Sequence, residues 1–297
     1  MTSVTTPTAP AASGAAAPPK ERRRSSSGGG GRPGSRLRVI APIAVFVLVM
    51  GAWTFVSESV LAEDSRFLLP APYDVIKVGL FDAANRAEIL DALWSTTQIA
   101  LTGLALAIVL GVLLAVVMSQ ARWAEFSLYP YAVVLQTIPI LAVVPMFGFW
   151  FGYEFTSRVI VCVMVALFPT ITNTLFGLKS VEPGLHDLFT LHGATRLQRL
   201  VRLQLPAALP AMVTGFKISG GMAIIGSIVA DFFFRQGEPG IGRMIDVYRQ
   251  RLATEQLLTC LILSSLVGLI VFWAFDLLGD HIDRRRSGRA ATTTTKS

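Results

Sequence analysis

Charged residues are scarce in this chain. Only 15% of its 297 residues are Asp, Glu, Lys or Arg, and 53% are hydrophobic, whereas soluble domains carry roughly 25% charged residues. This composition excludes an ordinary soluble domain and indicates one integral membrane domain with terminal tails. The formal net charge of +7 lies largely in the two tails, where anionic lipid and membrane topology explain it. We therefore expect a lipid bilayer, and no nucleic acid, among the partners.

Cysteine and histidine are also rare, with two and three copies. Cys162 and Cys260 fall inside hydrophobic runs. A disulfide between them is conceivable, but lone apolar cysteines are the favoured interpretation, because free Cys behaves as a small hydrophobe. No Cys/His spacing predicts a metal site. His186, His192 and His281 lie away from any nucleophile pattern, which argues against a membrane enzyme.

Six runs are apolar and long enough to cross a hydrocarbon core, which needs about 20 residues. They cover approximately residues 38–57, 94–118, 128–151, 157–177, 207–230 and 257–278. The sequence therefore predicts an all-α membrane protein with about six transmembrane helices. The residues before the first run are rich in Ala, Pro, Ser, Gly and Arg and lack aromatic side chains, which predicts a disordered tail.

Charge is distributed unequally along the chain. Both tails are basic, whereas residues 58–91 hold seven acidic and three basic side chains. The positive-inside rule therefore places both termini, and the basic stretch 178–206, on the cytoplasmic side of a multi-pass membrane protein. The predicted parts are a disordered basic cytoplasmic tail (1–36), a first transmembrane anchor (37–58), an extracytoplasmic loop (59–92), a transmembrane domain (93–279) and a basic cytoplasmic tail (280–297).

The first hydrophobic run has an alternative interpretation. Val60-Leu61-Ala62 resembles a small-residue cleavage site, as at the end of a signal peptide. However, the run spans about 18 residues and follows a long tail, whereas a signal peptide has a core of about 7–15 residues near the terminus. An anchor is therefore favoured, and cleavage would leave five spans.

Residues 182–206 are basic and carry a helical pattern between two hydrophobic runs. Gly193 is a plausible helix terminator, and Pro206 and Pro210 mark the entry into the fifth run. The pattern predicts a helix, a glycine turn, a basic helix, a proline break and a membrane helix; an interfacial helix on the inner leaflet is the alternative. The apolar stripes are Leu185, Leu188 and Phe189, then Leu197, Leu200 and Val201.

This segment resembles the cytoplasmic signature loop of ABC-importer permeases. That motif consists of Glu-Ala-Ala, three residues, Gly, nine residues, Ile, one residue and Leu-Pro. Here Asp187-Leu188-Phe189 takes the first three positions and keeps only the acid. Gly193 takes the glycine, Leu203 the isoleucine, and Leu205-Pro206 the end.

The resemblance extends from about residue 65 to 278 and favours the nitrate/sulfonate/taurine branch. The stretches FLLPAPYDV (67–75), QTIPILAVVPMFGFWFG (136–152) and IGSIVADFFF…GIGRMI (225–245) carry it. It implies the type I ABC importer permease fold, a location in the inner (plasma) membrane of a bacterial cell, and a path for a small polar solute. Nitrate, sulfonates, taurine and heterocyclic vitamin precursors all stay open, because a binding protein largely sets specificity in this family.

The resemblance also implies partners. Residues 182–206 would form a coupling helix held in a groove of a separate ABC ATPase, with an extracytoplasmic solute-binding protein and a second copy completing the assembly. This chain lacks the G-x-x-x-x-G-K-[ST] pattern, so the ATPase partner would use the ATP and this chain would bind no cofactor. We interpret the glycines between 237 and 242 as a turn. The implied ATPase-coupling residues are Leu185, Asp187, Leu188, Phe189, His192, Gly193, Ala194, Leu203, Leu205 and Pro206.

Prolines inside the apolar runs indicate a possible pathway. We expect Pro139 and Pro145 to interrupt the third span and Pro169 the fourth, and freed carbonyls must be buried in protein or line a cavity. A packing kink is an equal alternative. Lys217 falls near mid-membrane, where a structural ion pair or snorkelling is favoured over substrate contact; Asp231 is too far along the same helix, and Asp276 is the other candidate partner. The candidate path residues are Gln136, Thr137, Pro139, Pro145, Thr172, Asn173 and Lys217.

A secondary transporter, or another polytopic membrane protein without an ATPase partner, is the competing class. Secondary transporters usually carry intramembrane acids for coupling ions and an internal repeat. The span interiors here lack clear carboxylates, and no convincing repeat is present. These observations favour the importer permease.

Overall fold

The computed structural model describes residues 35–234 and 236–293, and every regular element in this part of the chain is helical. The predicted disorder of the basic tail therefore falls largely outside the described residues. The chain divides into two compact units, residues 1–49 and residues 50–297. The features that concern function all belong to the second unit.

Five described helices are long and apolar enough to cross a membrane, and the number is six if one bent pair counts as a span. This agrees with the predicted count. The first is α1 (Ser35–Phe55), continued by a π-helical turn over Val56–Val60. The acidic connection that follows is largely helical, with a 3₁₀ helix (Glu63–Leu68), α2 (Pro72–Ile76) and a π-helical turn (Lys77–Phe81).

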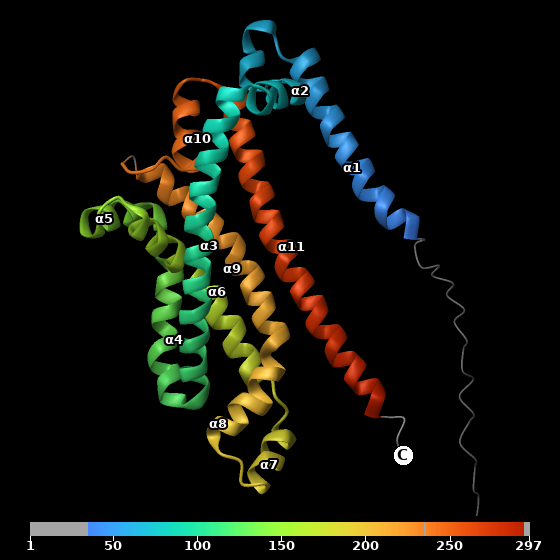
Figure 1. Cartoon of the computed structure of the whole chain (residues 1–297), viewed down its shortest axis with the longest axis vertical. Coiled ribbons are helices and arrows are strands. Elements are labelled where there is room, and N and C mark those ends of the chain that lie inside the picture. The colour runs from blue at the N-terminus through green and yellow to red at the C-terminus, as the bar shows by residue number, and fades with distance from the viewer. Residues whose placement is uncertain (1–34, 235, 294–297) are drawn as a thin grey trace, which may run out of the picture. The chain divides into compact units, whose positions relative to one another are not determined.

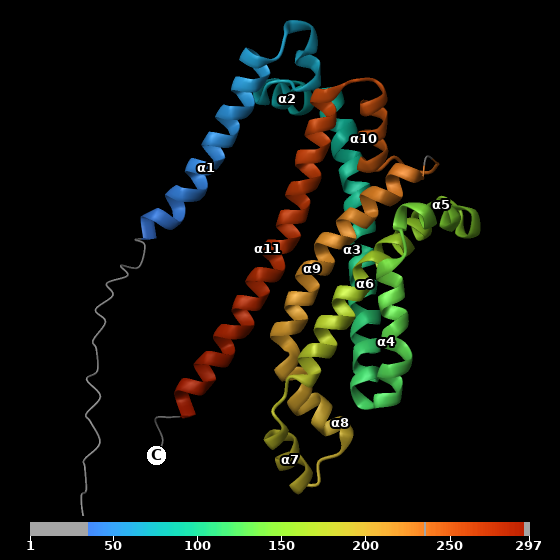
Figure 2. The same cartoon turned by 180° about the vertical axis from the view of Figure 1, so that it is seen from behind.

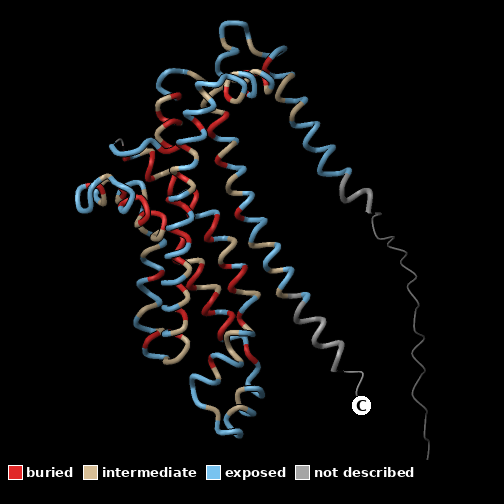
Figure 3. Tube along the Cα trace, viewed as in Figure 1, coloured by how far each residue is buried: buried red, intermediate tan, exposed pale blue. Residues whose placement is uncertain are grey.

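Helices α3 (Ala83–Gln120), α6 (Phe155–Lys179) and α9 (Leu205–Phe233) form the centre of the second unit and lie side by side in Figures 1 and 2. Most buried residues gather on them (Figure 3). Glycines allow the close approach: a Cβ at Gly111 of α3 would lie 2.6 Å from Cγ2 of Thr170 in α6. Small residues commonly serve this purpose between membrane helices, where close packing supplies the association energy.

The third predicted span is where the structure differs most. Instead of one helix over 128–151, the chain forms α4 (Arg122–Thr137) and α5 (Ile140–Phe151), bent by 100°. Pro139 has extended backbone angles and precedes α5, so this interruption is confirmed. The other two expected interruptions were wrong: Pro145 lies within α5 and Pro169 within α6, and both helices continue past them.

The chain after α6 forms α7 (Pro183–Leu191), α8 (Arg196–Arg199), a π-helical turn (Leu200–Gln204) and then α9. The predicted proline break was wrong, because the helix runs without interruption over Arg196–Phe233. Pro206 is the second residue of α9 and lies just after the π-helical turn, where the regular i→i−4 hydrogen-bond pattern is already altered.

The last two helices are α10 (Ile241–Gln250) and α11 (Thr254–Thr293), so the chain is still helical through most of the predicted C-terminal tail. Cys162 in α6 and Cys260 in α11 are both buried and free, which decides against a disulfide.

Candidate functional site

The segment predicted to couple to an ATPase forms a compact helix–turn–helix at one end of the second unit. In both views α7 and α8 lie at the end opposite α10 (Figures 1 and 2). The predicted order of helix, glycine turn and basic helix is confirmed.

Local hydrogen bonds fix the turn. Gly193 has a φ of 65°, its N–H donates to the Thr190 carbonyl at 3.0 Å, and the Ala194 N–H donates to the Phe189 carbonyl at 3.0 Å. This pattern is a Schellman motif, which satisfies carbonyls at the end of a helix. Thr195 and Gln198 then form a capping box that starts α8. The geometry of the segment therefore follows from its own sequence.

The apolar side chains of the segment divide into two groups. Leu200 is 9% exposed and belongs to the core cluster, against which Leu205 also packs. In contrast, Leu188 is 47% exposed, and Leu191, which the sequence analysis did not single out, is 86% exposed. Figure 3 shows this end as almost entirely exposed. Exposed leucines on α7, next to a hydrogen-bonded turn, are available to a partner.

The polar and terminal members of the predicted coupling set also lie at the surface or close to it. Asp187, His192 and Gly193 are exposed, and the Nδ1 atom of His192 lies 2.9 Å from the Leu188 carbonyl oxygen. The remaining positions are Leu185 and Pro206, which are exposed, and Phe189, Ala194 and Leu203, which are partly buried.

Replacing Gly193 tests the turn. No described atom lies within 4 Å of a Cβ built there, so only the positive φ opposes a side chain. Gly193→Val should destabilise the turn by about 1–2 kcal/mol, and Gly193→Asn by less, because Asn tolerates the left-handed conformation. Amide hydrogen exchange over 183–199 should quicken in the valine variant and change little in the asparagine variant. Equal exchange in both variants would contradict a conformational role for Gly193.

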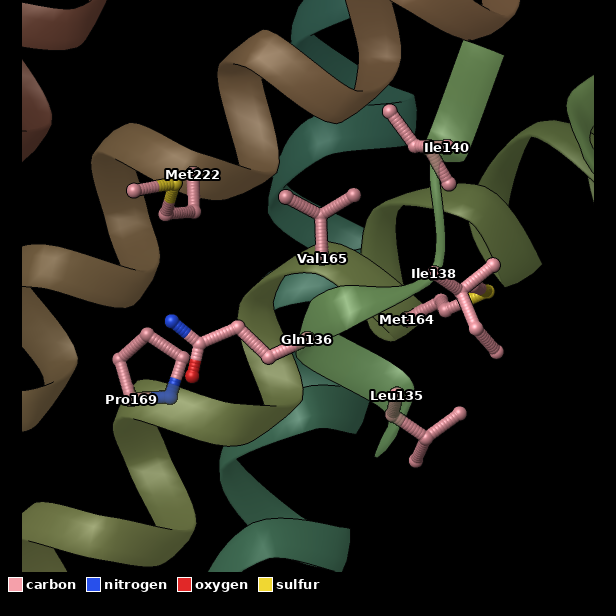
Figure 4. A pocket seen from close by; sticks show the side chains of 8 residues that line it. All are labelled: Leu135, Gln136, Ile138, Ile140, Met164, Val165, Pro169 and Met222. Atoms are coloured by element: carbon pink, nitrogen blue, oxygen red, sulfur yellow. The ribbon is translucent and has the colours of Figure 1, made fainter. Parts of the chain in front are cut away.

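A pocket lies where the bend between α4 and α5 meets α6 and α9. Its volume is about 240 Å³. Figure 4 shows the amide end of Gln136 beside the Pro169 ring, with Val165 and Met222 nearby. The lining residues are Leu135, Gln136, Ile138, Ile140, Met164, Val165, Pro169 and Met222. The structure thus brings Gln136 and Pro169, which come from different predicted spans, to one cavity.

The other candidate path residues do not line this pocket. Thr172 donates to the Phe168 carbonyl at 3.0 Å, and the Asn173 amide donates to the Pro169 carbonyl at 2.9 Å. Thr137 donates to the Val134 carbonyl at 3.0 Å, next to the bend. These hydroxyls and the amide satisfy backbone carbonyls of their own helices, as short polar side chains in membrane helices commonly do.

Lys217 is part of a structural ion pair. Its Nζ bonds to the Asp276 carboxylate of α11 and lies 4.9 Å from the centre of the Phe272 ring. Asp276 is one of the two partners considered from sequence. The pair joins α9 to α11, so Lys217 is engaged away from the pocket.

Comparison with known proteins identifies the family. The sequence profile of the family described as "Binding-protein-dependent transport system inner membrane component" matches residues 107–288. The chain belongs to this family. It is a membrane-spanning permease of the ABC importer class.

Individual relatives agree with this assignment. The permease is 31% identical over 245 residues to the formylaminopyrimidine transport permease protein of Halalkalibacterium halodurans, covering 81% of this chain and 94% of the relative. It is 27% identical over 221 residues to a putative aliphatic sulfonates transport permease protein of Bacillus subtilis, covering 74% and 78%. These relatives are transporter subunits rather than enzymes.

The fold also agrees with a solved structure. The inward-facing MetNI methionine ABC transporter contains a chain with a TM-score of 0.57 and 19% identity, covering 68% of the permease and 99% of that chain. At this identity the likeness supports the fold alone, and the predicted all-α importer permease fold is confirmed.

A buried ionic network near α10 was missed by the sequence analysis. Arg158 at the start of α6 donates to the Asp231 carboxylate at 3.0 Å, and both residues are buried, at 2% and 0% exposure. Thr96 of α3 donates to the other Asp231 oxygen at 2.5 Å and accepts from the Ile241 N–H at 2.7 Å. The network therefore joins α3, α6, α9 and the start of α10.

The loop residues 236–240, which precede α10, are tied to the same network. Arg158 also donates to the carbonyls of Gln236 and Glu238, each at 2.9 Å. Gly240 precedes α10 and Gly242 lies in its first turn, so only the first part of the predicted glycine turn is a turn. A Cβ at Gly242 would lie 2.8 Å from the Asp231 Cβ and 2.9 Å from the Phe232 nitrogen. These glycines allow the loop to approach the carboxylate.

Proposed function

We propose that this permease couples to a separate ABC ATPase through residues 182–206. The observation that carries the proposal is the hydrogen-bonded turn at Gly193, beside which leucines of α7 are exposed at the end of the second unit. Exposed apolar side chains on a preorganised element are the kind of surface that a partner protein buries as a hot spot.

The proposal includes the arrangement in the membrane. The segment 182–206 and both termini would face the cytoplasm, and α10 would lie near the outer face. Two copies of the permease and an extracytoplasmic solute-binding protein would complete the importer. ATP-driven closure of the ATPases would then move the coupling helices and switch the bundle between inward- and outward-facing states. The transported solute would be small and polar.

Co-expression tests this proposal. The permease is produced with the ATPase subunit encoded beside it, and the two are solubilised and purified through a tag on the permease. We expect the ATPase to copurify and to hydrolyse ATP faster in the presence of the binding protein. A variant in which alanine or glycine replaces each residue from 187 to 192 should no longer bind the ATPase, although the permease should stay folded.

Two results would contradict the proposal. One is a folded permease that binds no ATPase. The other is that substitutions throughout 185–206 change neither the binding of the ATPase nor the uptake of solute, which would favour a transporter that works without an ATPase partner.

A further inference from the structure

The pocket at the α4–α5 bend carries no charge. Among the described residues that line it, one, Gln136, has a polar side chain, and none is acidic or basic. Lys217, the basic residue considered for the path, is paired with Asp276 on α11. An anion that entered this pocket would lose water and gain no counter-charge, which is strongly unfavourable.

What the lining does offer is suited to a flat, uncharged ring. Met164 and Met222 supply thioether sulfurs, which make favourable contacts with aromatic rings. The Gln136 amide makes no hydrogen bond to a described residue, and it can donate and accept at the same time. Its N–H could donate to a ring nitrogen while its oxygen accepts from an adjacent amino group, as on the edge of a heteroaromatic ring.

The size of the pocket narrows the class further. Its volume of about 240 Å³ is below the roughly 300–1,000 Å³ of pockets that enclose drug-sized ligands. A single ring with short substituents is therefore favoured over a large fused system.

We propose that this pocket binds a neutral, single-ring heteroaromatic solute, whose polar edge forms hydrogen bonds with the Gln136 amide, and that it disfavours small anions such as nitrate and sulfonates. The inference rests on the proposed function, because it takes the pocket to be part of the transport path. It selects one solute class among those that the family resemblance leaves open.

A cysteine placed in the pocket tests this. Cys162 and Cys260 are 0% exposed, so Met222→Cys, at a position that is 38% exposed, introduces a thiol that aqueous reagents can reach. The thiolate attacks a methanethiosulfonate reagent, forms a mixed disulfide and releases methanesulfinate. Formylaminopyrimidine, nitrate and methanesulfonate are the competing probes. The reaction is followed by mass spectrometry on the permease in nanodiscs, with and without the ATPase.

We expect formylaminopyrimidine at about four times its dissociation constant to slow the modification about fivefold. Nitrate and methanesulfonate at the same concentration should leave the rate unchanged. Gln98→Cys, an exposed position on α3 outside the pocket, is the matched control, and no probe should protect it. Protection of the Met222→Cys thiol by either anion, or no protection by the pyrimidine, would overturn the proposal.

Two substitutions of Gln136, each made in the Met222→Cys background, separate charge from hydrogen bonding. Gln136→Leu should abolish protection by the pyrimidine without creating protection by anions. Gln136→Arg should raise the ratio of modification rates for an anionic against a cationic reagent by about tenfold, because a unit charge would now lie near the introduced thiol. An unchanged ratio would mean that Gln136 does not face the path of the reagent, which would overturn its assigned role.

These measurements need no ATP hydrolysis. If the ATPase never binds but the pyrimidine still protects the introduced thiol, the coupling proposal fails and the pocket assignment stands. If the ATPase binds and hydrolyses ATP, but the anions rather than the pyrimidine protect the introduced thiol, the pocket assignment fails and the coupling proposal stands.

Discussion

Arg158→Met should lower the free energy of unfolding of this permease by about 3–5 kcal/mol, because it leaves Asp231 as a buried charge without a counter-charge. Asp231 is 0% exposed, and its remaining partner side chain is the Thr96 hydroxyl. The same substitution removes two hydrogen bonds to the carbonyls of Gln236 and Glu238. Unfolding by SDS in mixed micelles measures the loss, and hydrogen exchange over 236–250 should show α10 becoming less protected.

Two further variants separate a buried charge from lost packing. Arg158→Met combined with Asp231→Leu should recover most of the loss, because replacing both members of a buried ion pair with apolar residues is often neutral. Lys179→Met is the matched control: Lys179 pairs with Glu125, but the side chains are 45% and 27% exposed, so it should cost about 0–1 kcal/mol. Equal losses for Arg158→Met and Lys179→Met would contradict the assigned role of the network.

The second large effect concerns association. Leu191→Asp should weaken binding of the ATPase by about 30- to 1,000-fold, corresponding to about 2–4 kcal/mol for an apolar hot spot replaced by a charge. Leu191 is 86% exposed, so stability of the free permease should change by no more than about 0.5 kcal/mol. Surface-immobilised permease in nanodiscs, titrated with the ATPase, gives the dissociation constants.

Leu252→Asp provides the matched control. Leu252 is 63% exposed and lies between α10 and α11, at the other end of the second unit, where its φ of 56° suits Asp better than Leu. This variant should bind the ATPase as the wild type does. If both variants lost binding equally, or neither did, α7 would not be the docking element.

The parts of the fold that sequence could predict are those encoded locally. The apolar runs are long enough to identify the five helices that can span a membrane, whereas the run over 128–151 forms the bent pair α4–α5. The turn at Gly193 was predictable because its determinants, a glycine and an adjacent Thr–Gln capping pair, all lie within a few residues.

The parts that sequence missed depend on distant residues. Arg158 and Asp231 are 73 positions apart. Asp231 belongs to a stretch that carries the family resemblance, but nothing in the sequence indicates Arg158 as its partner. Pro139 indicated an interruption, but the 100° bend depends on how α5 packs against its neighbours. The continuity through Pro206 was missed because a proline inside a helix usually breaks it, and the π-helical turn at Leu200–Gln204 has no signature in the sequence.

The uninterrupted helix from Arg196 to Phe233 has a mechanical consequence. Met222 lies 26 residues after Arg196, so about 39 Å of one helix separates the start of α8 from the pocket wall. If the helix tilted by about 5° about its Arg196 end, Met222 would move by roughly 3 Å, because the displacement grows with the length of the helix. Under the two proposals made above, one end of this helix would contact the ATPase and the other would line the solute pocket, so a small tilt at the first would move the wall of the second.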